Sequence, residues 1–192
     1  MLRYYEGNEY AMLDRDAINL RTDYGFFEYK LDVFELALCM GIRLIPYSEV
    51  KSKLHNYLLT EVKLCDGFTV MYNTCNGYEY LICYNDKLPE VRQRFTIAHE
   101  IKHVLYREIN PTQKEEDLAD HFARVLLAPP CLVMLMTRNY NAIEIGECFG
   151  VSKRAADNAI NAANGRMDAM GDRLKQYEAD YMALVKSQRI TA

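Results

Sequence analysis

The sequence predicts an α+β fold, in which a small, mostly antiparallel sheet packs against two helices and a helical subdomain follows toward the C-terminus. Two strand-like runs, residues 67–73 and 78–85, flank a short gap with an Asn-Gly pair, which is a strong β-hairpin signal. Directly after this hairpin, residues 94–107 and 115–127 place apolar side chains at helical spacing. From residue 138 onward the patterns are helical again.

The chain begins with a stretch whose role the pattern leaves open. Residues 1–27 are rich in Tyr and acidic groups, and their weak periodicity fits either a short helix around residues 14–20 or an irregular arm. We therefore divide the chain into an N-terminal arm at 1–27, a domain at 28–137 that holds the sheet and the two helices, and a C-terminal helical subdomain at 138–192.

Helix and strand patterns alternate before the hairpin. The segment LDVFELALCMG shows helical spacing, with Asp32 as an acid in its first turn and Gly41 as its C-terminal stop. IRLIPY, at 42–47, predicts a strand because it consists of β-branched and apolar residues. SEVKSKLHNYLL, at 48–59, predicts a second short helix.

The helix at 94–107 has two different faces. It contains the pattern H-E-x-x-H at His99 to His103, and two histidines four positions apart lie about 40° apart around a helix, so both imidazoles can reach one ion. Glu100 can reach a water on that ion without binding the ion itself, which is the position a general base needs. The opposite side carries a predicted buried stripe, formed by Ile97, Ile101, Val104 and Leu105.

The next helix, at 115–127, supplies a third candidate ligand. Glu116 and Asp120 lie four positions apart on one face, whereas Leu118, Phe122 and Val125 lie opposite. Two His and one Glu leave zinc one open position for water, as in a catalytic site. Asp120 is then expected to accept a hydrogen bond from a ligand histidine and so to fix its tautomer. Ala128-Pro129-Pro130 should end the helix.

The C-terminal part resembles a helix-turn-helix in its segment lengths. It combines residues 142–149, a turn that ends at Ser152 as the expected N-cap, and residues 153–163, followed by an amphipathic pattern at 167–187. Residues 138–192 hold eight Lys and Arg against seven Asp and Glu, a net charge of +1. This charge is small for phosphate neutralisation by a recognition helix, so we favour packing or partner docking over DNA contact for Lys153, Arg154, Asn158 and Asn161.

Composition narrows the protein class and the compartment. The 192 residues are 50% hydrophobic and 26% charged, the profile of a globular protein, and the net charge of −4 argues against a broad attraction to nucleic acid. No apolar run approaches the roughly 20 residues that span a bilayer, and the N-terminus lacks the apolar stretch of a secretory signal, so we expect a cytoplasmic protein without membrane contact.

The six cysteines form no C-x-x-C pair and no regular spacing, so we expect reduced thiols rather than a disulfide framework. A second metal site from Cys65, Cys75 and His55 is the less favoured alternative.

RFTIAHEIKH followed by ExxADHFARVLLAP resembles the ImmA/IrrE family of metallopeptidases, HExxH zincins whose usual pattern is RFTxAHExGH and then ExxA(N/D)xFAxxLLxP. The resemblance covers about residues 78–130 and implies a zincin-like fold, with His99, His103 and Glu116 as metal ligands and Glu100 as the catalytic glutamate. Lys102 departs from the family pattern, which usually has Gly there; this position needs no metal contact, and a helix interior tolerates Lys better than Gly.

The resemblance also implies how substrate binds. In zincins an edge strand beside the HExxH helix holds the substrate peptide extended, and residues 78–84 are our candidate strand, with Tyr78, Tyr80 and Tyr84 as candidate substrate-binding residues. An ordinary core strand is the equally weighted alternative. Tyr140 and Tyr84 are candidates for stabilising the oxyanion.

We therefore predict a cytoplasmic endopeptidase with one Zn²⁺ per chain. Members of the resembled family often cut helix-turn-helix repressors of mobile elements or stress regulons, so such a repressor is the expected substrate. Two alternatives stay open: a DNA-binding regulator with a vestigial metal site, and a repressor-binding protein that acts by contact alone.

Overall fold

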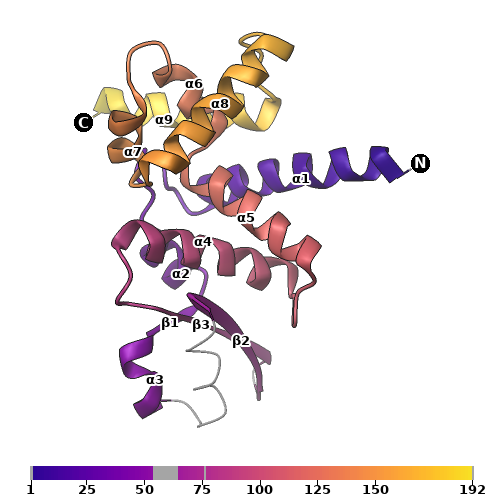
Figure 1. Cartoon of the computed structure of the whole chain (residues 1–192), viewed down its shortest axis with the longest axis vertical. Helices are drawn as coiled ribbons and strands as arrows, with labels where there is room; N and C mark the ends of the chain where they lie inside the picture. Colours follow the sequence, from indigo (N-terminus) through magenta and orange to yellow (C-terminus); the bar gives the residue numbers. More distant parts are fainter. Residues whose placement is uncertain (1, 54–64, 76, 192) are drawn as a thin grey trace. The chain divides into compact units, whose positions relative to one another are not determined.

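The computed structural model describes residues 2–53, 65–75 and 77–191, and the chain divides into two compact units (Figure 1). One unit is Asp32–Asp120, and the other joins Met1–Leu31 to His121–Ala192. Helix α5 (Gln113–Leu127) passes from one unit to the other between Asp120 and His121. These units are clusters of contacts, and the domain boundaries expected at residues 28 and 138 stay predictions.

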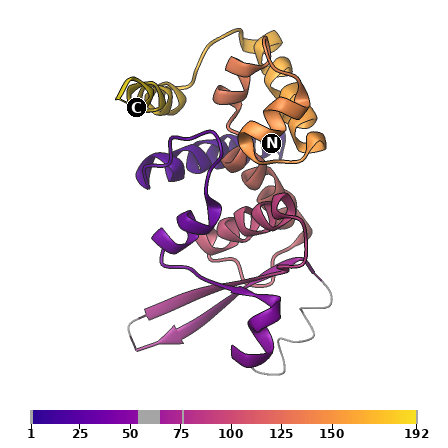
Figure 2. The ribbon, with the colours of Figure 1, turned by 90° about the vertical axis from the view of Figure 1, so that its left-hand side faces the viewer.

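The unit Asp32–Asp120 contains a three-stranded sheet, so the α+β class is confirmed. Its strands are β1 (Arg43–Pro46), β2 (Gly67–Thr74) and β3 (Gly77–Tyr84), in the order β1-β3-β2. The hairpin pair β2 and β3 is antiparallel, as predicted, whereas β1 runs parallel to β3. The sheet is therefore mixed, and β2 and β3 extend past α4 (Figure 2).

The strand order corrects the expected edge strand. β3 lies between β1 and β2, and its Leu81–Tyr84 half pairs on both sides. The edge-strand interpretation of residues 78–84 is therefore wrong, and the core-strand alternative describes β3. Among the described residues, β2 instead forms the outer strand on that side of the sheet.

Helices cover both faces of this sheet (Figure 1). Helix α4 (Glu90–Tyr106) contacts β2 and β3 on one face and also contacts α2 (Val33–Cys39). On the other face, α3 (Tyr47–Lys53) contributes Val50 to a core cluster with side chains from all three strands, namely Ile45, Phe68, Val70, Tyr72, Leu81 and Cys83. Because successive side chains of a strand point to opposite faces, Thr69 lies on the α4 side, between Phe68 and Val70.

Local capping chemistry explains the start and end of α2. Asp32 is its N-cap and accepts hydrogen bonds from the backbone N–H groups of Phe34 and Glu35, so it lies just before the first turn rather than within it. Gly41 follows at φ +75°, a conformation that favours glycine. The predicted helix at 48–59 corresponds to α3, and its part beyond Lys53 lies outside the described residues.

In the other unit, every secondary-structure element that the structure describes is a helix. Besides the end of α5, it comprises α1 (Leu2–Asp23), α6 (Pro130–Met136), α7 (Ala142–Phe149), α8 (Lys153–Met170) and α9 (Gln176–Thr191). Helix α1 packs against α9, and α8 packs against α6 and α7. At its centre the buried Arg21 donates hydrogen bonds to the Tyr181 hydroxyl (2.7 Å) and to the Leu126 carbonyl (3.0 Å).

Two expectations for this unit need correction, and a third is confirmed with one addition. The N-terminal stretch forms a helix of 22 residues rather than a short helix or an irregular arm. The double proline does end α5, but Pro130 then opens α6, because Pro is accommodated in the first helical turn where its missing N–H costs no hydrogen bond. Residues 167–170 belong to α8, which ends at Gly171 with φ +65°, so the last helix begins only at Gln176.

Among the described residues, no single helix has the length and apolar character needed to cross a membrane. The bent pair α5 and α6 meets these criteria together, on length and composition alone.

Candidate metal centre

Helix α4 has the two faces that the sequence predicts. One face carries the candidate metal ligands, and most of the opposite face is buried. It begins after Pro89 and ends where Arg107 adopts a left-handed conformation at φ 54°. On the core face Ile97 and Ile101 are completely buried. Val104 is also buried, whereas Leu105 is 39% exposed and does not belong to this stripe.

Three candidate ligand side chains converge, two from this helix and one from α5. The Nε2 atoms of His99 and His103 lie 3.1 Å apart, and Glu116 of α5 places Oε2 3.0 Å from His99 Nε2 and Oε1 3.6 Å from His103 Nε2. Tetrahedral ligands at about 2.0–2.1 Å from a zinc ion would lie about 3.3 Å from one another, so these three groups fit one metal ion. His99, His103 and Glu116 are thus a group that could bind a metal.

The second nitrogen of each imidazole contacts a carboxylate. His99 Nδ1 lies 3.0 Å from Asp120 Oδ1, as expected from the sequence, and His103 Nδ1 lies 2.6 Å from Glu108 Oε2. With Nδ1–H donated to a carboxylate, each Nε2 has a lone pair for a metal. The two histidines and the carboxylates that contact their Nδ1 atoms therefore have the arrangement typical of a metal centre.

Glu100 lies beside the three ligands and is only 7% exposed. Its Oε2 accepts a 2.8 Å hydrogen bond from the hydroxyl of Thr69 on β2. Burial raises the pKa of Glu100 above its ordinary value, and this effect outweighs the opposing influence of Thr69 and the two histidines. A carboxylate with a raised pKa is suited to accept and return a proton.

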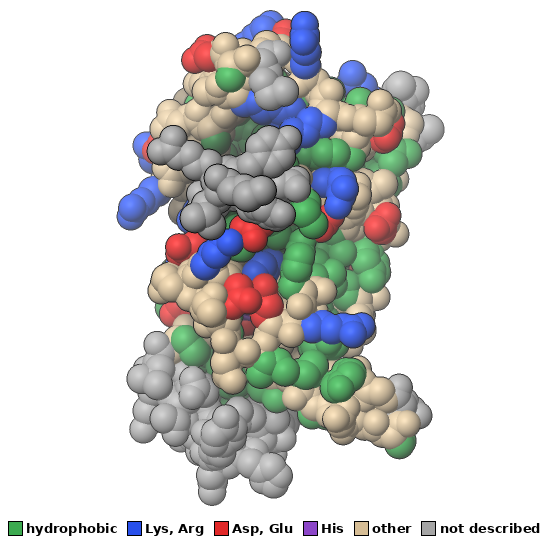
Figure 3. Space-filling view, turned by 90° about the vertical axis from the view of Figure 1, so that its right-hand side faces the viewer, with side chains coloured by type: hydrophobic (Ala, Val, Ile, Leu, Met, Phe, Trp, Pro, Cys, Tyr) green, Lys and Arg blue, Asp and Glu red, His purple; other side chains and the backbone are tan. Residues whose placement is uncertain are grey.

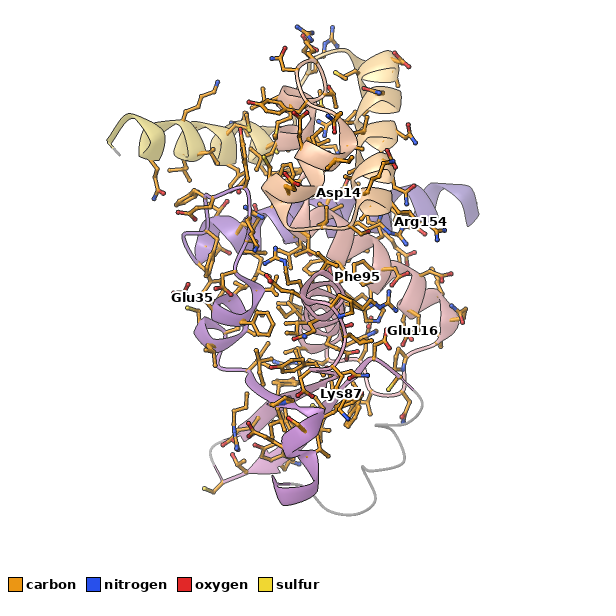
Figure 4. The ribbon with its side chains drawn as sticks, turned by 60° about the vertical axis from the view of Figure 1, so that its left-hand side comes forward. Asp14, Glu35, Lys87, Phe95, Glu116 and Arg154 are labelled. Carbon is orange, nitrogen blue, oxygen red and sulfur yellow. The ribbon has the colours of Figure 1, made fainter. Side chains whose placement is uncertain are left out.

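A cleft of about 930 Å³ opens over these groups. Strand β2 forms one wall, with Gly67, Phe68, Thr69, Val70 and Met71, and α4 with α5 forms the other (Figure 4). Figure 4 shows Glu116 on α5 and Phe95 on α4, both of which line the cleft. Gly67 is required at the near end of β2, because a Cβ there would lie 2.3 Å from Thr96 of α4.

The structure separates the four tyrosines singled out from the sequence. Tyr80 lines the cleft, whereas Tyr78, which is 55% exposed, does not. Tyr84 does not line it either and packs its ring against Phe34, with 5.7 Å between the centroids. Tyr140 belongs to the other compact unit and is 47% exposed. The cleft therefore favours Tyr80 among these candidates.

Sequence reasoning missed Glu108, Thr69 and the contacts of Lys102. Lys102 is 1% exposed and pairs with Glu108. The available signal was charge, because a Lys so close to the buried face of a helix needs a carboxylate partner. Nothing local to the sequence indicated which carboxylate or which strand residue would be brought to the site.

Helices α7 and α8 are joined by a short turn at residues 150–152. Ser152 caps α8 by accepting a hydrogen bond from Ala155 N–H, and Gly150 ends α7 at φ 63°. Lys153 and Arg154 are exposed, but Lys153 pairs with Asp157 at 2.8 Å, which reduces its positive field. On the face shown in Figure 3, basic side chains are likewise interspersed with acidic ones among the described residues.

Comparison with protein families gives one assignment. The model of the family described as Peptidase_M78, IrrE N-terminal-like domain, matches residues 37–161, about two thirds of the chain. Among curated proteins, none matches the chain significantly.

Proposed function

This chain belongs to the Peptidase_M78 family of IrrE N-terminal-like domains, which indicates a metallopeptidase, and we propose that it is a zinc-dependent endopeptidase of the cytoplasm. The observation that carries this proposal is the convergence of His99, His103 and Glu116, with the two imidazoles backed by carboxylates and Glu100 beside them. Two histidines and one carboxylate are the ligand set of catalytic zinc sites that leave a position open. Among the described residues the cysteines form no disulfide, which suits a reducing compartment.

Each residue has a defined task in this proposal. His99, His103 and Glu116 hold the metal, which when bound polarises the scissile carbonyl and lowers the pKa of water. Glu100 takes a proton from the water as the new C–O bond forms at the carbonyl carbon, and it then passes that proton to the amine nitrogen, which leaves as the amide C–N bond breaks. The hydroxyl of Thr69 holds one oxygen of Glu100 and leaves the other free for this transfer.

The substrate strand of this proposal is β2 rather than β3. Among the described residues β2 is the outer strand; it contributes Gly67 to Met71 to the cleft wall, and its Thr69 bonds to Glu100. An extended peptide can pair with the free backbone groups of an outer strand. Such pairing would place a peptide bond between β2 and the candidate metal ligands.

The family likeness supports the substrate class. We propose a helix-turn-helix repressor, cut in an accessible linker, because an extended segment fits the cleft between β2 and α4 better than a folded domain does. Relief of repression would then follow from loss of the intact repressor.

Incubation of the zinc-loaded protein with purified helix-turn-helix repressors, beginning with any that is encoded next to its gene, tests the proposal. Mass spectrometry should find two fragments that sum to the intact repressor plus one water, and a zinc chelator should abolish them. Loss of operator binding by an intact repressor would instead favour the alternative that the protein acts by contact. A salt-dependent shift of promoter DNA by the protein alone would favour the DNA-binding alternative.

A further inference from the structure

Lys102 is a fully buried cation in the middle of the HExxH segment. It is 1% exposed, and its Nζ lies 2.5 and 2.6 Å from the two oxygens of Glu108 and 3.2 Å from the Glu115 carbonyl. An ammonium group has three N–H donors, and these three acceptors can use them all. The burial of this charge is thus compensated completely by one carboxylate and one carbonyl.

The same carboxylate reaches the candidate metal ligand. Glu108 Oε2 lies 2.6 Å from His103 Nδ1, so a single oxygen contacts both the lysine and the imidazole. The side chain of Glu108 is 13% exposed, and that of His103 is 4% exposed. Lys102, Glu108 and His103 therefore form one buried network, in which the lysine contacts the ligand only through the carboxylate.

The backbone explains why Glu108 lies there. Arg107 adopts the left-handed conformation directly after α4, and the N–H of Glu108 then donates a 2.9 Å hydrogen bond to the carbonyl of His103. This reversal turns the chain back along its own helix. It places the Glu108 carboxylate beside the ring of a residue five positions earlier.

The two histidines are held differently. Asp120, the partner of His99 Nδ1, is 41% exposed and lies on α5, at 3.0 Å. Glu108 is more buried, lies closer to its imidazole, and has both oxygens fixed by a lysine. A carboxylate held in this way cannot rotate toward the metal and compete as a ligand without leaving Lys102 unpaired.

We propose that Glu108 is the positioning residue for His103, accepting its Nδ1–H so that Nε2 faces the metal, and that Lys102 holds Glu108 in that position. This inference rests on the metal centre of the proposed function. It gives a role to the lysine at the one HExxH position that departs from the resembled family's usual pattern.

The test compares two double variants, because removing Glu108 alone would leave a buried lysine unpaired and could unfold the chain. Lys102→Met with Glu108→Leu removes both charges and the acceptor, whereas Lys102→Met with Glu108→Gln removes both charges and keeps an acceptor of nearly the same shape. Thermal unfolding of the metal-free proteins should show that both variants fold. Zn²⁺ affinity is measured by competition with a chromogenic chelator, independently of peptidase activity.

The Leu double variant should bind Zn²⁺ roughly 10- to 100-fold more weakly than wild type, as losses of outer partners of metal ligands usually do. The Gln double variant should recover most of that loss. In ¹⁵N-histidine spectra of the zinc form, the His103 Nδ1–H signal should persist with Gln and broaden or vanish with Leu. Lys102→Met alone should weaken binding less than the Leu double variant, and an unchanged affinity would remove the role assigned to Lys102.

The remaining outcomes separate this inference from the proposed function. Equal Zn²⁺ affinity in wild type and both double variants would overturn the role of Glu108 while the metal centre stands. Wild-type protein that takes up no Zn²⁺ would overturn the metal centre and this inference together. Loss of affinity in the Leu variant would support the inference even if the wild type cut no repressor.

Discussion

The hydroxyl of Thr69 donates a 2.8 Å hydrogen bond to Oε2 of Glu100, which joins the outer strand β2 to the helix that carries the candidate metal ligands. Through this bond the wall of the cleft also orients the expected general base. A group that positions a base without binding the metal should affect turnover and leave metal content unchanged.

Thr69→Val, which removes the hydroxyl and keeps the shape, should lower the turnover number roughly 10- to 150-fold, since a hydrogen bond to a charged group contributes about 1.5–3 kcal/mol. Steady-state cleavage of the repressor would measure the turnover number, and metal analysis would measure the metal content, which should not change. Thr74→Val is the matched control, because Thr74 lies at the far end of the same strand, where its hydroxyl donates to the carbonyl of Gly77 on β3. Equal losses in both variants would assign the effect to the strand and not to Glu100.

Glu100→Gln should retain Zn²⁺ and the fold but leave the repressor intact. The amide has nearly the same shape as the carboxylate, so Thr69 can still bond to it, but it cannot accept the proton of water. Co-expression of the repressor with each form of the protein, under inducing conditions, followed by blotting for repressor size would measure the result. A variant that relieves repression as well as wild type, with intact repressor in both cases, would exclude the proteolytic mechanism.

Glu116→Ala should abolish stoichiometric zinc, whereas Glu115→Gln should not. Glu116 contacts both histidine Nε2 atoms, but Glu115 turns its carboxylate to the backbone N–H and hydroxyl of Thr112, at 2.6 and 2.8 Å. Asp120→Ala should fall between them, with zinc affinity lowered roughly 10- to 100-fold. Metal analysis of freshly purified protein measures all three, and equal zinc loss from the Glu116 and Glu115 variants would contradict the assigned ligand.

Asp14 should make stability in the helical unit depend on pH. Burial raises the pKa of Asp14, but the hydrogen bonds and charges of His121 (2.8 Å) and Lys175 (3.4 Å) outweigh burial, and the net pKa lies below the ordinary 3.8. A lowered pKa means that the folded state favours the carboxylate. Its stabilisation is therefore fully present well above pH 3.8 and is lost as the pH falls through the lower, folded-state pKa.

Asp14→Asn should accordingly lower the urea midpoint at pH 7, and the difference from wild type should shrink steadily below pH 3.8. Asp16→Asn is the control on the same helix, since its ion pair with Arg15 is at the surface and should contribute little. A difference between wild type and Asp14→Asn that stays constant across this range would rule out the charge of Asp14 as its cause.

The sequence by itself determined the features that depend on neighbours along the chain. His99 and His103 lie on the same side of α4 because of helical geometry. The antiparallel pairing of β2 with β3 follows from the short Asn-Gly segment between them, which favours a hairpin. The caps at Asp32 and Ser152 are likewise properties of single turns. Each needs contacts across only a few residues, which composition and spacing specify directly.

Tertiary structure decided the contacts that join distant segments. The parallel pairing of β1 with β3 moved the expected edge strand to the middle of the sheet, because pairing between strands far apart in sequence depends on how both faces of the sheet are covered. The left-handed turn at Arg107 brought Glu108 to His103, and the packing of the helix end left Leu105 exposed although Val104 beside it is buried. Periodicity assigns a residue to a face of its own element, but only the packed chain determines which group lies opposite that face.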